Sequence, residues 1–348
     1  MYRHGEPVVD LWGGFRDVEK CQPWREDTLV LVFSATKGLT ATGIHQLVEE
    51  GRLDLDAPVA RYWPEFGQAG KDRIPLAWIL SHRAGVPAVD AALSTEEVLA
   101  GPALLDAIAR QTPAWEPGTA HGYHPRTFGW ILGEVVRRVT GASLGRHLAL
   151  RVAAPLGLDF HLGLAEEHEP RVATLVPPEP PRSAIARRVQ ARLLGPKTLL
   201  GRALHGPGEL AYGEVWNTRA LHAAEMPSSN GIATAHALAR HYAALIGEVD
   251  GIRLLHPQSV AKARQPAVRG RDRLLVLPTS FGLGYMLPPS LSPACGPESF
   301  GHPGAGGSLA FADPGAGLGF GYAINRMRLG LTGDARSRSL VEAVYACL

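Results

Sequence analysis

A serine and a lysine spaced three residues apart form the first pair of side chains suited to catalysis. The run Ser34-Ala35-Thr36-Lys37 follows an apolar segment and opens a stretch with helical periodicity. Residues three apart lie on the same face of a helix, so Lys37 can reach the Ser34 hydroxyl. A serine is a weak nucleophile until a base accepts its proton, and burial favours the neutral form of a lysine. The spacing alone is a weak signal, because such short matches arise often by chance.

The elements around this pair favour an active serine. The apolar run 28–33 predicts a strand that leads directly into Ser34, and the apolar spacing after it predicts a helix over 35–50. The hydroxyl would then lie near a helix N-terminus, where free N–H groups and the helix dipole stabilise developing negative charge.

The rest of the chain predicts strands at both ends and helices between them. Alternating patterns predict strands over 8–12, 281–287, 308–312 and 318–325, and helices are expected over 127–139, 144–152, 182–202, 234–245 and 337–348. The Pro-rich segment 170–182 reads as a surface loop or lid. We therefore expect an α+β protein, with an antiparallel sheet flanked by terminal helices and an inserted, mostly helical domain. Residues 1–38 and 265–348 would form the sheet domain and 39–264 the insertion, together making a single interleaved catalytic unit.

Composition and charge argue against several other classes. The 348 residues are 45% hydrophobic and 20% charged, which is ordinary for a soluble globular protein, and the net charge of +2 favours neither a nucleic-acid nor a membrane partner. No apolar run approaches the roughly 18 residues of a membrane span, and residues 1–12 hold no signal-peptide core. Three widely spaced cysteines predict neither a disulfide framework nor a metal site. We expect a cytoplasmic protein without metal or cofactor.

Four motifs, in order along the chain, resemble those of the serine β-lactamase-like and penicillin-binding-protein-like superfamily. Ser34 to Lys37 resembles the S-x-x-K motif, 80–87 the next signature loop, Gly122-Tyr123-His124-Pro125 the Y-x-N position, and 301–307 the K-T-G or H-x-G motif on an edge strand. The matches cover nearly the whole chain, which makes the combination highly specific. Segment 225–231, with the helix after it, is most similar to the class C-like family VIII carboxylesterases.

The resemblance implies a role for each matching residue. Ser34 would be the nucleophile of a covalent acyl-enzyme, and Lys37 would help it lose its proton. Tyr123 would shuttle that proton, with its pKa lowered by the Lys37 ammonium. The backbone N–H groups of Ser34 and Ala305 would form the oxyanion hole. Substrate contacts are expected from His302, Gly304, Trp216 and Asn217. Two alternatives stay open: Trp216 could pack in the core, and His302 could have a structural role in the sheet.

Two departures from the family pattern move the prediction from β-lactamase to esterase. Pro125 stands where lactamases carry Asn, so the amide that holds a lactam carbonyl is missing. His302 replaces Lys and would leave a weaker, pH-dependent positive charge opposite a substrate carboxylate. We predict a serine hydrolase that cleaves a small carboxylic ester. The alternatives are acyl transfer in a biosynthetic pathway, weak β-lactamase or D-peptidase action, and a catalytically silent binding scaffold.

Other motifs are interpreted as structural. Gly141 to Gly145 fits G-x-S-x-G, but a helix rather than a strand precedes Ser143, which predicts a helix start. The K-T-like run 196–198 lacks the glycine of the motif, and the S-D-N-like run 228–230 falls too late in the chain. His121 and His124 beside Tyr123 have no further ligand at metal-site spacing, so turn or rim positions are expected.

The first strand is expected to be short. Only residues 1–4 precede the Gly5 turn, where family members usually carry a helix and a full strand, so either the start is truncated or this strand is nearly absent. A missing strand exposes a sheet edge. Self-association into a homo-oligomer through that edge is therefore a further expectation.

Overall fold

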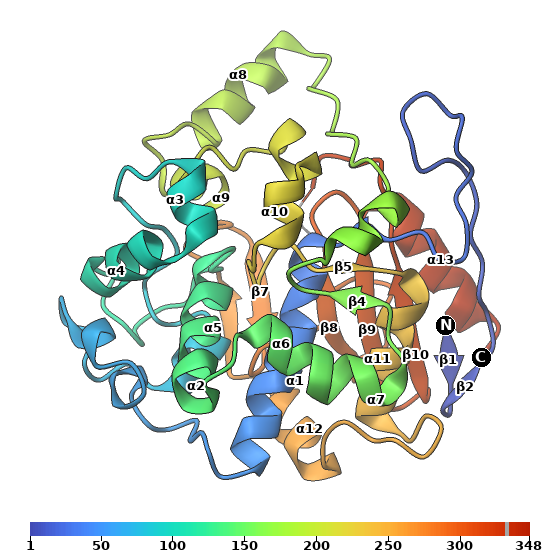
Figure 1. Ribbon diagram of the computed structural model, residues 1–348, viewed down its shortest axis with the longest axis horizontal. Helices are drawn as coiled ribbons and strands as arrows, with labels where there is room; N and C mark the ends of the chain where they lie inside the picture. Colours follow the sequence, from blue (N-terminus) through green and yellow to red (C-terminus); the bar gives the residue numbers. More distant parts are fainter. Residues whose placement is uncertain (331–333) are drawn as a thin grey trace.

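The main sheet of the computed structural model, which describes residues 1–330 and 334–348, is antiparallel and has the strand order β2-β1-β10-β9-β8 (Figure 1). Its strands are β1 (Tyr2–Arg3), β2 (Glu6–Pro7), β8 (Phe300–Pro303), β9 (Leu309–Asp313) and β10 (Leu318–Tyr322). A hairpin of β6 (Val268–Arg271) and β7 (Pro278–Phe281) joins β8 through single bridges at Met286. Strands β3 (Val30–Leu31), β5 (Ile232–Ala233) and β4 (Phe160–His161) form a separate small sheet. The predicted α+β class is confirmed.

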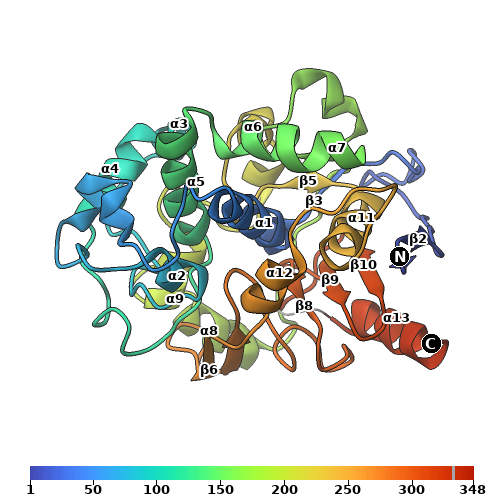
Figure 2. The same cartoon turned by 90° about the horizontal axis from the view of Figure 1, so that it is seen from below.

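Both faces of the main sheet are covered by helices. Large and small side chains alternate along β10, so that the small ones face one helix and the large ones face the other. Helix α11 (Ala235–Ile246) packs on one face and α13 (Ala335–Ala346) on the other (Figure 2). Phe311 and its register partner Phe320 belong to the apolar cluster that includes Val341 of α13. On the opposite face, a Cβ at Gly319 or Gly321 would overlap the backbone of α11. Glycines in β10 therefore let α11 lie directly on the sheet.

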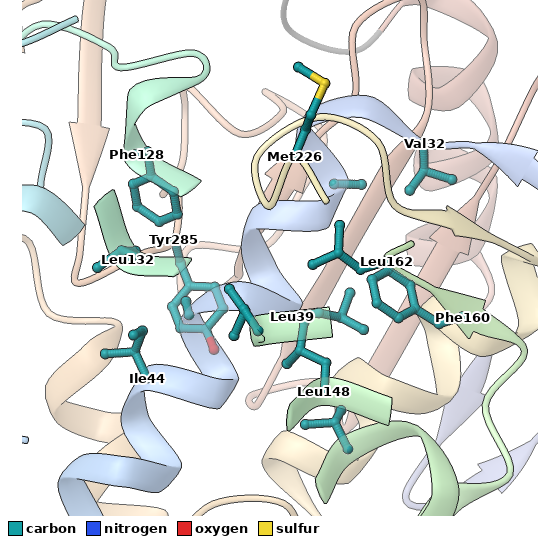
Figure 3. Packing of buried hydrophobic residues seen from close by; sticks show 14 of the residues in the cluster. Val32, Leu39, Ile44, Phe128, Leu132, Leu148, Phe160, Leu162, Met226 and Tyr285 are labelled. Atoms are coloured by element: carbon teal, nitrogen blue, oxygen red, sulfur yellow. The ribbon is translucent and has the colours of Figure 1, made fainter. Parts of the chain in front are cut away.

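Helix α1 (Thr36–Glu49) runs through the centre of the molecule and carries the predicted serine-lysine pair at its start. Its residues from 36 to 47 are all buried, and small residues let neighbouring helices approach: a Cβ at Gly38 would overlap the Tyr242 hydroxyl of α11. Figure 3 shows Leu39 and Ile44 of α1 packed among apolar side chains from α5 and the β4 region. A helix buried on all sides is a rigid support for a site.

The remaining helices lie mainly between β3 and β6 in the chain. They are α2 (Leu76–Leu80), α3 (Thr95–Ala100), α4 (Pro102–Arg110), α5 (Thr127–Thr140), α6 (Leu144–Leu148), α7 (Ala154–Leu156), α8 (Ala184–Leu193), α9 (Leu199–His205), α10 (Arg219–Ala223) and α12 (Pro257–Ala263). Several begin at a side-chain cap; Thr234, for example, accepts a hydrogen bond from Ala237 N at the start of α11. No helix in the two described ranges is long and apolar enough to cross a bilayer.

Four expectations differ from the structure. The first strand pair lies at 2–7 instead of 8–12, as a hairpin around Gly5. The strand expected over 281–287 ends at Phe281, because Gly284 turns the chain with a φ of 95°. The single helix expected over 182–202 is divided into α8 and α9, since Gly195-Pro196 cannot continue it. Helix α11 falls inside the interval expected to form the insertion, yet it packs on the sheet.

Candidate active site

Ser34 lies in a tight turn between strand β3 and helix α1, within the 3₁₀ turn Phe33–Ala35. The residue before it, Phe33, has a φ of 47°, which is unusual for a bulky side chain and marks a strained backbone. The Phe33 ring packs against Tyr212 and Trp216, with ring centroids 5.2 and 4.8 Å away. This packing holds the turn that presents the serine, which is itself only partly buried.

Lys37 is fully buried, and its Nζ lies 3.3 Å from Ser34 Oγ. The same nitrogen donates hydrogen bonds to Pro125 O at 2.7 Å and Ser228 O at 3.1 Å. Burial, and then the positive charge of Arg126, hold the pKa of Lys37 well below its ordinary value. A neutral amine has two N–H donors and one lone pair. With both donors directed at carbonyl oxygens, the lone pair is left for Ser34.

Tyr123 donates its hydroxyl to Ser34 Oγ at 2.7 Å. Burial raises the pKa of Tyr123 above its ordinary value, so the phenol stays protonated. The expectation that a Lys37 ammonium lowers this pKa is wrong, because burial is the largest cause and raises the pKa of Tyr123, and Lys37 is not among the groups that shift it. Rings of His82, Phe281 and His302 surround the phenol, with centroids 5.0, 6.1 and 5.7 Å from its own.

The backbone of Tyr123 is held by a buried carboxylate that the sequence analysis did not single out. Asp272 is completely buried, and its two oxygens accept the Tyr123 N–H at 2.9 and 3.1 Å. It also accepts hydrogen bonds from Leu274 N, Leu275 N and the Thr279 hydroxyl. Asp272 lies in the loop between β6 and β7, where no motif marks it.

The turn after β8 places Ala305 at the cavity that Ser34 also borders. Gly304 approaches the strand end before Ser34 so closely that a Cβ would overlap Val32 O. The neighbours Gly304, Gly306 and Gly307 donate to backbone carbonyls, whereas Ala305 N–H has no acceptor in the two described ranges. A free backbone N–H beside Ser34 is what an oxyanion hole requires.

His302 carries no positive charge, contrary to expectation. The side chain is buried, and burial, followed by the Lys37 charge it would face, lowers the pKa of His302 to about 3. Its Nδ1 lies 2.8 Å from Pro303 O, to which it donates, and its Nε2 has no partner in the part of the chain that is described. The ring stays neutral and packs beside Tyr123.

A small cavity of about 20 Å³ adjoins the serine. That space accommodates roughly one water molecule. Trp216 borders it although its side chain is completely buried in the main core, while Asn217 does not border it: its amide pairs with the backbone of Leu175. The full lining is Phe33, Ser34, Tyr123, Pro125, Arg126, Leu204, Tyr212, Trp216, Ser229 and Ala305.

The other motifs take structural positions, with one exception. Ser143 caps α6 and donates to Glu225, and Thr198 of the K-T-like run caps α9. His121 contacts the Thr279 hydroxyl, and the His124 ring accepts from Val86 N and donates to Gly122 O. The 228–230 run, given little weight from the sequence, does reach the site, because Ser228 O accepts from Lys37 and Ser229 borders the cavity.

This combination of sheet, central helix and serine-lysine-tyrosine cluster has clear relatives. The beta-lactamase family model matches residues 1–344, and the chain belongs to that family. The esterase/beta-lactamase LipL of Mycobacterium tuberculosis is 37% identical over 335 residues, covering 94% of this chain and 76% of the relative.

Two solved structures are similar over almost the whole chain. A family VIII carboxylesterase has a TM-score of 0.90 and 38% identity, covering 99% of this chain and 90% of the other. A penicillin-binding-protein homologue from Caulobacter crescentus has a TM-score of 0.89 and 38% identity, covering 100% of this chain and 91% of the other.

Proposed function

We propose that this protein is a serine hydrolase that cleaves small carboxylic esters through an acyl intermediate on Ser34. One observation carries the proposal: Ser34 Oγ lies within hydrogen-bonding distance of both a buried amine, Lys37, and a buried phenol, Tyr123. The names of the relatives agree with it, since LipL is called an esterase/beta-lactamase and a structure 38% identical is titled a family VIII carboxylesterase.

Lys37 serves as the base in this scheme. As Ser34 Oγ attacks the ester carbonyl, its proton passes to the lone pair of Lys37 Nζ. The resulting ammonium is stabilised by the carbonyl oxygens of Pro125 and Ser228, which already accept its hydrogen bonds. The lysine is thus a base that gains charge only during the reaction.

The negative oxygen of the tetrahedral intermediate is bound by the N–H groups of Ser34 and Ala305. The intermediate collapses as the C–O bond to the alcohol breaks, and the departing oxygen takes the proton of the Tyr123 hydroxyl. The Lys37 ammonium then reprotonates Tyr123. Water repeats the sequence in reverse on the acyl-serine and releases the acid.

Esters are favoured over lactams by Pro125. It offers no side-chain amide to hold a lactam or peptide carbonyl, and its own carbonyl is occupied by Lys37.

The test compares Ser34→Ala with Ser143→Ala, a matched control in the G-x-S-x-G run. With p-nitrophenyl butyrate as substrate, Ser34→Ala should lose at least about 10³-fold in kcat. Ser143→Ala loses a helix cap, worth about 1 kcal/mol of stability, and a hydrogen bond to Glu225, but Ser143 does not border the cavity, so turnover should be retained. Intact mass should show an acyl adduct on the wild type and none on Ser34→Ala.

Other outcomes identify the alternatives. Equal turnover by Ser34→Ala would overturn the mechanism. An adduct that clears only after an alcohol or amine is added would make the protein an acyltransferase. Absence of both turnover and adduct would indicate a silent binding scaffold.

The cellular compartment is part of the proposal as well. Cys21, Cys295 and Cys347 are all free thiols. Free thiols, two of them exposed, support a reducing environment such as the cytoplasm.

A further inference from the structure

An arginine is buried in the wall of the cavity beside the serine. Arg126 is 4% exposed and borders the same space as Ser34, Tyr123 and Ala305. Its Nε donates to Leu204 O at 3.1 Å, and Nη2 donates to the same oxygen and to Leu210 O. Its Nη1 is buried and has no hydrogen-bond acceptor in either described range. Two of its five N–H donors are therefore unused.

The charge of Arg126 is also uncompensated. Within the described ranges no Asp or Glu shifts its pKa, and the titratable groups around it are the phenols Tyr212 and Tyr123, the amine of Lys37 and the ring of His205. Its guanidinium carbon lies 5.0 Å from the ring centroid of Trp216, a cation–π contact that attracts the cation but supplies no negative charge. Burial lowers the pKa of Arg126 to about 10, so the group stays charged at neutral pH. A buried cation without an anion is costly, and a site keeps one at that cost when a ligand supplies the anion.

We propose that Arg126 binds a carboxylate carried by the substrate, so that the preferred substrates are esters with a free carboxylate near the scissile bond. The inference deepens the proposed function and depends on it. His302, the residue at the family's third motif, is neutral and therefore does not form an ion pair with the carboxylate. The planar guanidinium fork matches a carboxylate in two parallel hydrogen bonds.

Substrate entry and anion binding are linked by geometry. The cavity beside Ser34 measures about 20 Å³. The stretch that carries Leu204, Leu210 and Tyr212 borders the cavity or supplies acceptors to Arg126, so an outward shift of this stretch would enlarge the site for an ester. That shift removes the two carbonyl acceptors from the guanidinium. The substrate carboxylate then replaces them and also meets the donors on Nη1.

The experiment compares charged and neutral esters of matched shape. On the acyl side the pair is monophenyl adipate and phenyl hexanoate; on the alcohol side it is 4-acetoxybenzoate and 4-methylphenyl acetate. Values of kcat/KM are measured for the wild type, Arg126→Met, Arg126→Lys and the control Arg83→Met. Arg83 also lies over a tryptophan, 4.9 Å from the Trp78 ring, and donates to a backbone carbonyl, but it does not border the cavity.

The wild type should prefer the charged ester of at least one pair by about tenfold or more, as expected for a desolvated ion pair. Arg126→Met should reduce this preference ratio at least about tenfold, Arg126→Lys should reduce it less, and Arg83→Met should keep it. No preference in the wild type, or equal losses on both esters in Arg126→Met, would overturn the proposal. If no ester is cleaved in a Ser34-dependent manner, the proposed function itself fails.

Discussion

Lys37 Nζ lies 3.3 Å from Ser34 Oγ, and its remaining hydrogen bonds go to carbonyl oxygens of two distant segments, at Pro125 and Ser228. Those carbonyls set the direction in which the amine faces the serine. The base is thus oriented by backbone rather than by a second side chain, in contrast to a serine-histidine-aspartate arrangement.

The pH dependence of kcat/KM should have an acidic limb set by Lys37. The lysine is active when neutral, so the rate falls as the pH drops through its lowered pKa. Arg126→Met removes the charge that contributes to this lowering, and the limb should move to higher pH. Because burial raises the pKa of Tyr123, no alkaline limb is expected from it below about 10. A limb that stays in place in Arg126→Met, recorded with a neutral ester, would argue against Lys37 as the base.

Tyr123→Phe should lower kcat by about 10²- to 10⁴-fold, because the leaving alcohol loses its proton donor. The ring packing with His82 and Phe281 is kept, so the thermal unfolding midpoint should change little. Tyr62→Phe serves as the control, since its hydroxyl bonds only a remote loop at Asp54. Turnover of a p-nitrophenyl ester measures both, and wild-type kcat in Tyr123→Phe would remove the phenol from the mechanism.

Gly304→Ala should reduce kcat strongly, by roughly 10²-fold or more, as when an oxyanion donor is lost. The new Cβ would overlap Val32 O and displace Ala305 from the serine turn. Gly13→Ala is the matched control, because a Cβ there meets no atom within 4 Å. If steady-state kinetics show equal activity for the two variants, the Ala305 N–H does not bind the oxyanion.

Mild acid should destabilise the fold through buried histidines. Burial lowers the pKa of His124, His241 and His302 to about 3, and that of His82 well below its ordinary value. The unfolded chain takes up these protons near pH 6.5, so stability is complete above that pH and falls below it, by about 1.4 kcal/mol per pH unit for each histidine. Urea unfolding from pH 7.5 to 4.5 measures the slope. His241→Gln should make it shallower by about one proton; an unchanged slope would contradict a neutral His241.

Features with a strong local signal were predictable. Helix α5, helix α11 with its Thr234 cap, and strands β9 and β10 agree with their periodicity to within a few residues. The turn at Gly284 and the break at Gly195-Pro196 were missed because an alternating or helical pattern continues through them. The position of α11 on the sheet depends on glycines in β10, and no local pattern shows that distant contact.

In the site, too, residues in sequence motifs were predictable, whereas properties that depend on burial or distant contacts were not. Ser34, Lys37 and Tyr123 were found through motif order and do converge. The protonation of Tyr123 and His302 was expected incorrectly, because burial is a property of the folded molecule. Arg126 and Asp272 lie outside every motif, and only the fold brings them to the tyrosine and the cavity.

Phe33 combines two tasks that protein engineers usually want to change separately. Its strained backbone, with a φ of 47°, immediately precedes the serine, while its ring packs against Tyr212 and Trp216 and borders the cavity beside Ser34. A smaller side chain at 33 would widen the pocket but release the packing that holds the nucleophile in place. Redesign for bulkier acyl groups should therefore begin at Leu204, which borders the cavity, and leave Phe33 and its ring partners Tyr212 and Trp216 unchanged.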